Sequence, residues 1–259
     1  MTGITAEAKI VRIENLKAIE IKQMYELFEQ YYECISFETF QKDLQKKDAA
    51  VVIRDEKSHV IRGFSTYKIL SIPTQVDGVK KAIRGMFSGD TIVAKELWGS
   101  KILNGAIAKI FLIQKLRYPL ADFHWFLISK GYKTYLGLTN NFTDFYPRFD
   151  DETPEIYQQV IDSYALALYP ESYDRESGLL KFKESLGQLK AHVTPIDLEL
   201  MNSQPHVRFF QERNPDWSKG DELVCVGIVN WKMFLMYGLK VLGLSQKKQK
   251  ALQRQPTSL

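Results

Sequence analysis

Apolar and polar positions alternate in two different ways along the first part of the chain. Residues 8–13 alternate singly, which is typical of a short strand. From Leu16 to Tyr32 the apolar residues recur every three or four positions, which predicts an amphipathic helix. Ser36 is a favourable N-cap for a second helix over residues 37–44, because a serine side chain can accept a hydrogen bond from a free backbone N–H group.

Three extended segments are expected after these helices. Residues 50–54 and 60–72 are apolar and β-branched and lie on either side of a short polar stretch, which predicts paired strands. Residues 81–93 predict a third, long strand. A helix with rows of stacked apolar residues follows Gly99, and Pro119 ends it because proline cannot continue a helix.

The second half of the chain is less regular, and prolines interrupt it between residues 171 and 214. Its expected elements are a strand over 124–129, a helix over 133–149 with a turn at Pro147, a helix over 154–168, a strand over 222–229 and an apolar segment over 231–244. We expect one α/β domain, with a core over residues 1–150, a C-terminal elaboration over 151–245 packed on the same domain, and a flexible basic tail over 246–259.

The composition is that of an ordinary soluble globular protein, with 45% hydrophobic and 25% charged residues. No apolar run approaches the ~20 residues that span a bilayer, and the N-terminus lacks the pattern of a signal peptide. Cys34 and Cys225 match no metal or redox spacing, and the four histidines are too dispersed for a metal site. These features favour a cytoplasmic protein with no bound metal.

Positive charge is concentrated near the C-terminus. The formal net charge of +4 is too small to indicate nucleic-acid binding. After Glu222 there is no acidic residue, and the apolar stretch 229–242 leads into a basic tail. Residues 229–254 would suit peripheral contact with a membrane, contact with an acidic acyl carrier protein, or the wall of a tunnel for a long acyl chain. The alternative is a helix buried against the core, followed by an ordinary solvated surface.

A small-residue turn between a strand and a helix is the clearest candidate site. Gly99, Ser100 and Lys101 stand just ahead of the helix that starts near Ile102. The free backbone N–H groups and the positive end of the helix dipole converge above such a turn, where they can bind a phosphate. An ordinary strand-to-helix connection with one glycine would explain the same residues.

The order of the elements and this turn resemble the GNAT acyltransferase superfamily. In that family a loop after the fourth strand, with a basic residue and two glycines, binds the pyrophosphate of coenzyme A. Here the matching stretch runs from Val93 through Trp98, Gly99, Ser100 and Lys101 to Ile102. Gly99 fits the first glycine, but Trp98 replaces the basic residue and Lys101 the second glycine. The resemblance implies a GNAT-like fold with a mixed, mainly antiparallel central sheet flanked by helices, and acyl-CoA or acyl-phosphopantetheine as co-substrate.

A second part of the resemblance lies between Thr139 and Tyr146. GNAT enzymes often carry an asparagine early in this helix and a tyrosine about two turns later. The resemblance implies that Asn140 or Asn141 binds the carrier and that Tyr146 protonates the departing thiolate. A core or surface position for Tyr146 is the alternative.

Acyl transfer to an amine needs a general base near the acceptor, because only the uncharged amine is a nucleophile. Asp90 and Glu96 flank the end of the third long strand, and His124 begins the next one. Each has a structural alternative: Asp90 can cap a bend, Glu96 can be solvated, and His124 can pack against its neighbour Trp125.

These observations predict a GNAT-like N-acyltransferase. We expect it to move an acyl group, with a long chain favoured over acetyl, from a CoA or acyl-carrier-protein thioester to an amine of an amino acid or peptide. One alternative is an acetyl-CoA-dependent N-acetyltransferase of small amines. The other is a non-catalytic GNAT-like module that binds an acidic protein or a membrane surface.

Overall fold

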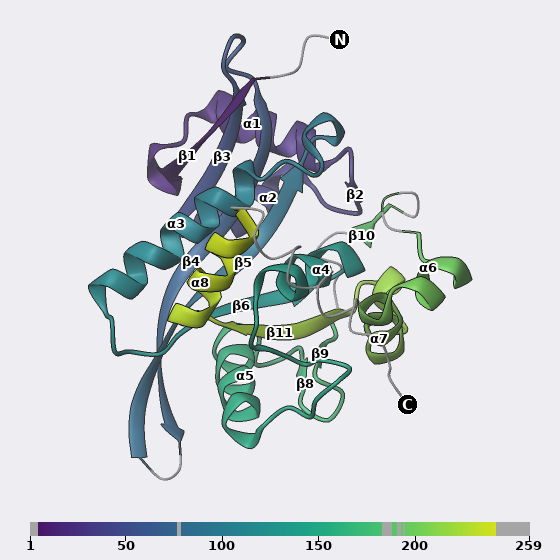
Figure 1. Cartoon of the computed structure of the whole chain (residues 1–259). Coiled ribbons are helices and arrows are strands. Elements are labelled where there is room, and N and C mark those ends of the chain that lie inside the picture. The colour runs from purple at the N-terminus through teal and green to yellow at the C-terminus, as the bar shows by residue number, and fades with distance from the viewer. Residues whose placement is uncertain (1–4, 77–78, 183–187, 191–192, 194, 242–259) are drawn as a thin grey trace, which may run out of the picture.

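The computed structural model describes residues 5–76, 79–182, 188–190, 193 and 195–241 of the chain (Figure 1). A nine-stranded sheet runs through the molecule in the order β1-β3-β4-β5-β6-β11-β9-β8, and β7 pairs with β11 at one side. The strands of this sheet are β1 (Ala6–Arg12), β3 (Ala49–Asp55), β4 (Ile61–Val76), β5 (Val79–Val93), β6 (Phe123–Ser129), β7 (Phe145–Tyr146), β8 (Tyr173–Asp174), β9 (Leu179–Leu180) and β11 (Glu222–Ile228).

The strand pairing confirms the predicted fold class. All neighbours in this sheet are antiparallel except β5 and β6, which are parallel. The sheet is therefore mixed and mainly antiparallel, and helices flank both of its faces (Figure 1). A separate small sheet joins β2 (Tyr32–Glu33) to β10 (Gln188–Leu189).

The alternation of side chains along β3 divides the helices between the two faces. Ala50 and Val52 pack in one cluster with α1 (Ala18–Phe28) and α2 (Phe37–Gln45). Ala49 and Val51 belong to another cluster, which includes residues of α3 (Ile102–Arg117), α4 (Tyr132–Asn141) and α8 (Trp231–Val241). Successive strand residues point to opposite faces, so α1 and α2 cover one face and α3, α4 and α8 the other. Ser36 caps α2 as expected: its Oγ accepts a hydrogen bond from the Thr39 amide at 3.2 Å.

Two strands of the central sheet separate part-way along their length. β5 pairs with β6 only from Arg84 to Ser88. Its remaining residues, to Val93, pair with β4 alone. A bulge marks the point of separation, because Ser65 lies opposite Thr91 whereas Tyr67 lies opposite Ser88, which leaves an extra residue on β5. The sheet is therefore open between the last residues of β5 and β6.

The C-terminal part of the chain returns into the same sheet. β11 is buried along its whole length and pairs with β6 from Leu223 to Ile228. α5 (Glu155–Leu168) packs in a third cluster with β5, β6 and β11. The remaining elements of this part are α6 (Leu198–Ser203), α7 (Pro205–Arg213) and α8. The short 3-10 helices are η1 (Ile13–Asn15), η2 (Lys95–Leu97) and η3 (Trp217–Lys219).

The prediction of a helix over residues 133–149 is wrong in its second half. α4 ends at Asn141, and Phe145 and Tyr146 form the short strand β7 opposite Gly227 and Val226. The two rings point to opposite faces, Phe145 into the cluster under α4 and Tyr146 into the one under α5, so a strand buries both and a helix would not. α6 and α7 were not predicted. The predicted tail over 246–259 lies outside the described residues.

The close approach of β5, β6 and α5 can be tested at Gly85. A Cβ atom there would lie 2.7 Å from the backbone oxygen of His124 and 2.3 Å from the buried hydroxyl of Tyr164. We expect Gly85→Ala to lower the free energy of unfolding by about 1–3 kcal/mol, because the backbone must shift to make room. The control is Gly105→Ala in α3, where a Cβ meets nothing within 4 Å; it should stabilise the helix by ~0.5–1 kcal/mol. Equal urea denaturation midpoints for the two variants would contradict this packing.

Candidate functional site

The opening between β5 and β6 holds a cavity of about 350 Å³. Its walls come from both faces of the sheet: Thr39 and Asp43 of α2 lie on one side, and Leu103 and Ile107 of α3 on the other. The last residues of β5, from Phe87 to Val93, line it along its length. The cavity therefore passes through the sheet and can bring together molecules that enter from opposite faces.

A buried lysine packs against the bulge on β5. The Lys47 side chain is 4% exposed, and its Nζ atom lies 2.5 Å from the Asp43 carboxylate. A Cβ at Gly89 would lie 2.6 Å from the Lys47 Cε atom and 2.6 Å from Thr66 Oγ1. Glycine is thus the residue that lets Lys47 pass close to the backbone at this point. The next residue on the bulged strand is Asp90.

Asp90 lies among paired charges at the edge of the cavity. Asp43 is paired with Lys47, and Glu222 with Lys130 at 3.1 Å, whereas the ion pairs of the described residues include none with Asp90. Burial away from water raises the pKa of Asp90 from 3.8 to about 6, and the negative charge of Asp43 adds to this, while the two lysines oppose it. A carboxylate with a pKa near 6 is ionised at neutral pH and remains basic enough to accept a proton.

Aromatic residues complete this half of the cavity. Tyr32 and Tyr169 line it beside Asp90. Burial raises the pKa of both hydroxyls, and the neighbouring carboxylates raise it further. Both tyrosines are therefore uncharged at neutral pH. The Lys130 ammonium lies 5.5 Å from the ring centroid of Tyr32, a cation–π contact.

The other half of the cavity ends at the turn before α3. Trp98 lines it, and the Trp98 indole donates a hydrogen bond to the Val93 carbonyl at 2.7 Å. The Lys133 ammonium lies 4.2 Å from the centroid of the Trp98 ring. Gly99 follows with a φ of 81°, in the left-handed region that glycine adopts without strain. The ring and the ammonium thus lie together where the cavity meets α3.

The N-terminus of α3 has free hydrogen-bond donors. No side chain caps it, and its first turn contains no acidic residue. Leu103 and Asn104 of this turn line the cavity. The first amide groups of a helix have no partner within the helix and lie at the positive end of its dipole, so an anion at this place would be stabilised.

Three of the predicted site residues line the cavity: Asp90, Val93 and Trp98. Gly99, Ser100, Lys101 and Ile102 form the turn and the start of α3 beside it. The cavity is also lined by five residues that were not predicted from the sequence: Tyr32, Lys47, Lys130, Tyr169 and Glu222. These five come from different elements, and no local pattern marks them.

The other two candidates for a general base lie outside the cavity. Glu96 is 3.5 Å from the guanidinium of Arg62, in a separate surface hollow. His124 is buried at the start of β6, where its Nδ1 atom lies 3.3 Å from the Arg84 carbonyl and its ring meets Tyr164 edge-on. The structure thus places only Asp90, of the three, beside the opening of the sheet.

The residues proposed from the second part of the resemblance also lie elsewhere. Tyr146 is buried in β7, stacked on Tyr157 with ring centroids 5.1 Å apart. Asn140 and Asn141 end α4, and Asn141 donates to the Gly137 carbonyl at 2.7 Å. None of the three lines the cavity, whereas Thr134 and Gly137 of α4 do. The face of α4 that lines the cavity is therefore the one that carries Thr134 and Gly137.

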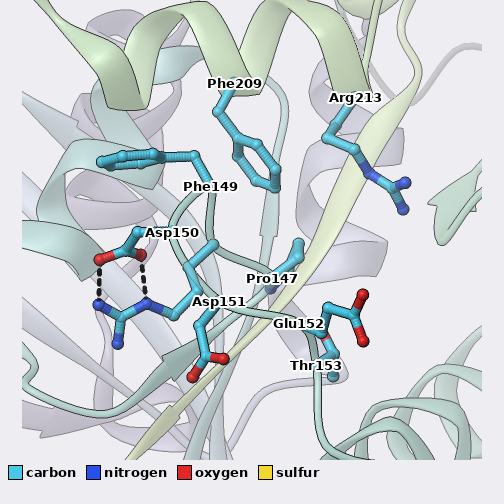
Figure 2. A pocket seen from close by; sticks show the side chains of 9 residues that line it. Pro147, Phe149, Asp150, Asp151, Glu152, Thr153, Phe209 and Arg213 are labelled. Atoms are coloured by element: carbon cyan, nitrogen blue, oxygen red, sulfur yellow. Dashed lines mark hydrogen bonds and ion pairs between the residues drawn. The ribbon is translucent and has the colours of Figure 1, made fainter.

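A second hollow, of about 490 Å³, lies between residues 147–153 and α7 (Figure 2). Arg148 and Asp150 form a two-point ion pair there, at 2.5 and 2.6 Å, so their charges cancel. Phe149 and Phe209 form its apolar wall (Figure 2). None of the residues proposed from the sequence lines this hollow, and we therefore place the candidate active site between β5 and β6.

The described residues form neither a cluster of metal ligands nor a helix that could span a membrane. Among the described residues, no group of histidine, cysteine, aspartate and glutamate is arranged to bind a metal ion. None of the helices described here is both long and apolar enough to cross a bilayer. Membrane contact through residues 229–254 stays a prediction: Trp231, Leu235 and Met236 are exposed on α8, and residues 242–254 lie outside the described part.

No protein-family profile and no curated protein sequence matches this chain. Among solved structures, a GNAT-family N-acetyltransferase from Escherichia coli, YhbS in complex with CoA, is 14% identical, with a TM-score of 0.35 over 56% of this chain and 72% of that one. NAA60 from Arabidopsis thaliana, solved with acetyl-CoA, is 12% identical, with a TM-score of 0.38 over 52% of this chain and 84% of that one.

A third similar structure is an Enterococcus faecalis protein described as a probable N-acyltransferase. It is 14% identical, with a TM-score of 0.35, and the match covers 51% of this chain and 31% of that one, so this chain spans about a third of its length. These similarities are distant, and the fold of this chain is defined by its own strand pairing. That pairing gives the mixed, mainly antiparallel sheet that the GNAT resemblance implies.

The raised pKa of Asp90 predicts how stability changes with pH. Folding raises this pKa from 3.8 to about 6, so the folded chain holds a proton that the unfolded chain releases, and stability falls as the pH rises from about 4 to about 6. Asp90→Asn removes this loss, so the variant should gain stability relative to the wild type over that interval and keep the gain at neutral pH.

Urea denaturation at about pH 4 and about pH 7 would measure this gain. Asp216→Asn is the matched control, because the Asp216 side chain is 51% exposed and lies outside the cavity. A loss of stability in Asp90→Asn, relative to the wild type, between these two pH values would contradict the assigned environment of Asp90.

Proposed function

We propose that this chain is an N-acyltransferase that moves a short acyl group from a thioester of the coenzyme A type to a primary amine. One observation carries the proposal: Asp90, with a pKa of about 6, lies on the bulge where β5 and β6 separate, in a cavity that passes through the sheet. This arrangement provides a base at a point that a donor and an acceptor can reach from opposite faces.

The features on the α3 side fit a thioester carrier that bears phosphates. The free amides of the α3 N-terminus and the ammonium groups of Lys101 and Lys133 would stabilise a pyrophosphate. The exposed strand edge between Gly89 and Val93 has backbone groups that β6 does not pair, and these can bind the amide groups of a pantetheine arm. The acyl carbon would then lie in the opening, next to Asp90.

The chemical step needs one proton acceptor. The amine nitrogen attacks the thioester carbonyl carbon, and its proton passes to the Asp90 carboxylate, directly or through a water molecule. The tetrahedral intermediate then collapses, the carbon–sulfur bond breaks, and the thiolate leaves with the electron pair. The products are an amide and a thiolate, which takes a proton from the Asp90 carboxylic acid or from water to give the free thiol and restore the carboxylate. A thiol has a pKa near 8.5, so its thiolate can leave near neutral pH without a dedicated acid, and Tyr146 need not lie in the site.

The lining of the cavity favours a short acyl group. Of the α8 residues whose side chains the structure describes, Trp231 to Leu239, none lines it. The described part of this segment therefore does not form the wall that a tunnel for a long acyl chain would need. A donor carried by an acidic carrier protein stays an alternative to free coenzyme A, as does a long acyl chain whose path lies outside the described part of the chain.

A thiol-release assay with acetyl-CoA, longer acyl-CoA thioesters and a panel of amines tests the proposal. We expect turnover with the wild type, with kcat/KM rising as the pH passes through about 6, because Asp90 must be ionised to accept a proton. Asp90→Asn should lower kcat by about 10²- to 10⁴-fold.

Asp216→Asn, the exposed control, should keep wild-type turnover. Full activity in Asp90→Asn would contradict the role of Asp90. Binding of a lipid or an acidic protein that weakens with salt, with no thioester consumed by the wild type, would favour the non-catalytic module instead.

A further inference from the structure

Two helices on one face of the sheet are apolar on their outer side. α3 and α8 both pack into the cluster that contains Ala49 and Val51 of β3, so both cover the same face of the sheet (Figure 1). Of the sixteen large hydrophobic side chains that are exposed in the described part of the chain, seven lie on these two helices and on the turn that follows α3. These seven residues, which we call the apolar face, are Leu112, Ile113, Leu116, Leu120, Trp231, Leu235 and Met236.

The spacing of these residues places them along the outer side of each helix. Leu112 and Leu116 are four positions apart, and so are Trp231 and Leu235, so each pair forms a row along its helix. These four side chains are 38% to 64% exposed. The outer side of a surface helix normally carries polar residues. A group of exposed apolar residues there is typical of a surface that contacts another molecule.

The charges on the same surface are positive. Neither α3 nor α8 contains an acidic residue. Lys109 stands four positions before Ile113, and Arg117 four positions after it, so both basic residues lie on the outer side of α3. Both are exposed, and among the described residues neither belongs to an ion pair. Lys232 of α8 is paired with Asp144 at 3.1 Å, so the net positive charge of this surface comes from α3.

From these observations we propose that the apolar face is a docking surface for a bilayer leaflet that contains anionic lipids. The leucines and Trp231 would enter the boundary between the headgroups and the acyl chains, where tryptophan is favoured because its ring is apolar and its N–H group is polar. Lys109 and Arg117 would stay at the level of the phosphates, with their alkyl stems against the apolar face. None of the seven residues lines the cavity, so this proposal is independent of the proposed reaction.

A second copy of this chain would fit the apolar face less well. In a two-fold symmetric contact the same surface meets itself, so Lys109 and Arg117 of both copies would be brought into one interface. Because α3 and α8 carry no acidic residue, these charges would lose water without gaining a partner. A leaflet with anionic headgroups provides the partners that a second copy lacks.

The test is flotation of the full chain with lipid vesicles. We expect the wild type to float with vesicles of phosphatidylcholine and phosphatidylglycerol in equal parts, and to float less with phosphatidylcholine alone. Added salt should weaken binding to the anionic vesicles, because it screens the attraction between the basic residues and the headgroups. Failure of the wild type to float with the anionic vesicles would overturn the proposal.

One double variant tests the apolar part of the surface. Leu116→Gln/Leu235→Gln should lower the affinity for anionic vesicles by at least about tenfold, because two leucines no longer enter the bilayer. The control, Leu166→Gln/Leu198→Gln, changes two exposed leucines of α5 and α6 that lie outside the apolar face, and it should keep the wild-type affinity. All four positions are exposed, and thermal unfolding shows that each variant is folded.

A second double variant tests the charges. Lys109→Gln/Arg117→Gln should lower the affinity for anionic vesicles by about tenfold or more, because each basic residue at such a surface contributes about fivefold. It should leave the weaker binding to phosphatidylcholine unchanged. The control, Lys22→Gln/Lys42→Gln, removes the same net charge from α1 and α2 on the other face of the sheet, and its effect should be much smaller.

The other outcomes would each overturn the proposal. Equal flotation of the wild type and both double variants would mean that the lipid contact lies elsewhere on the chain. A wild type that does not float, but sediments as a dimer that Leu116→Gln/Leu235→Gln dissociates, would assign the apolar face to a second copy. A wild type that binds poly-glutamate and no vesicles would assign it to an acidic protein. None of these measurements uses a thioester, so the acyltransferase proposal is tested separately.

Discussion

The parting of β5 and β6 is the constraint on which the candidate site depends. Parallel pairing between these strands stops at Ser88 and Leu127, where the bulge adds a residue to β5. A fully paired sheet would have no space between its strands, because neighbouring strands lie only about 4.8 Å apart. The opening creates the cavity, frees one edge of β5 for a ligand, and places Asp90 in the cavity wall, where burial and the nearby Asp43 charge raise its pKa. β4 keeps the other edge of β5 in place, so the opening need not disrupt the sheet.

The charged groups at this opening lower the stability of the folded chain, but they suit the proposed proton transfer. Three carboxylates and two lysines line one half of the cavity, and burying each of them costs free energy that only pairing offsets. The pairs Lys47–Asp43 and Lys130–Glu222 offset this cost, whereas Asp90 stays in surroundings that disfavour its charge. A group held in this way is typical of functional sites, where a shifted pKa matters more than stability. Gly89 belongs to the same arrangement, because it lets Lys47 reach Asp43.

Periodicity in the sequence was enough to predict most of the fold. The helix capped by Ser36, the long strands before Gly99 and the strand before Gly131 are formed by local patterns that packing reinforces. Asp90 could be proposed because it lies at the end of a predicted strand. The lysines, Glu222 and Tyr169 could not, since they come from elements far apart in the chain and meet only in the folded molecule. Tyr146 was placed on a helix because no glycine or proline stands between Gly137 and Pro147 to mark the true end of α4 at Asn141.

A crystal structure of the chain with an acyl-thioether analogue of coenzyme A would test the central claim most directly. We expect the sulfur atom to lie between the separated ends of β5 and β6, near Asp90, with the pyrophosphate at the first amides of α3 and the pantetheine arm along Gly89 to Val93. An analogue bound outside this opening, for example in the hollow beside Arg148 and Phe209, or no binding at all, would contradict it.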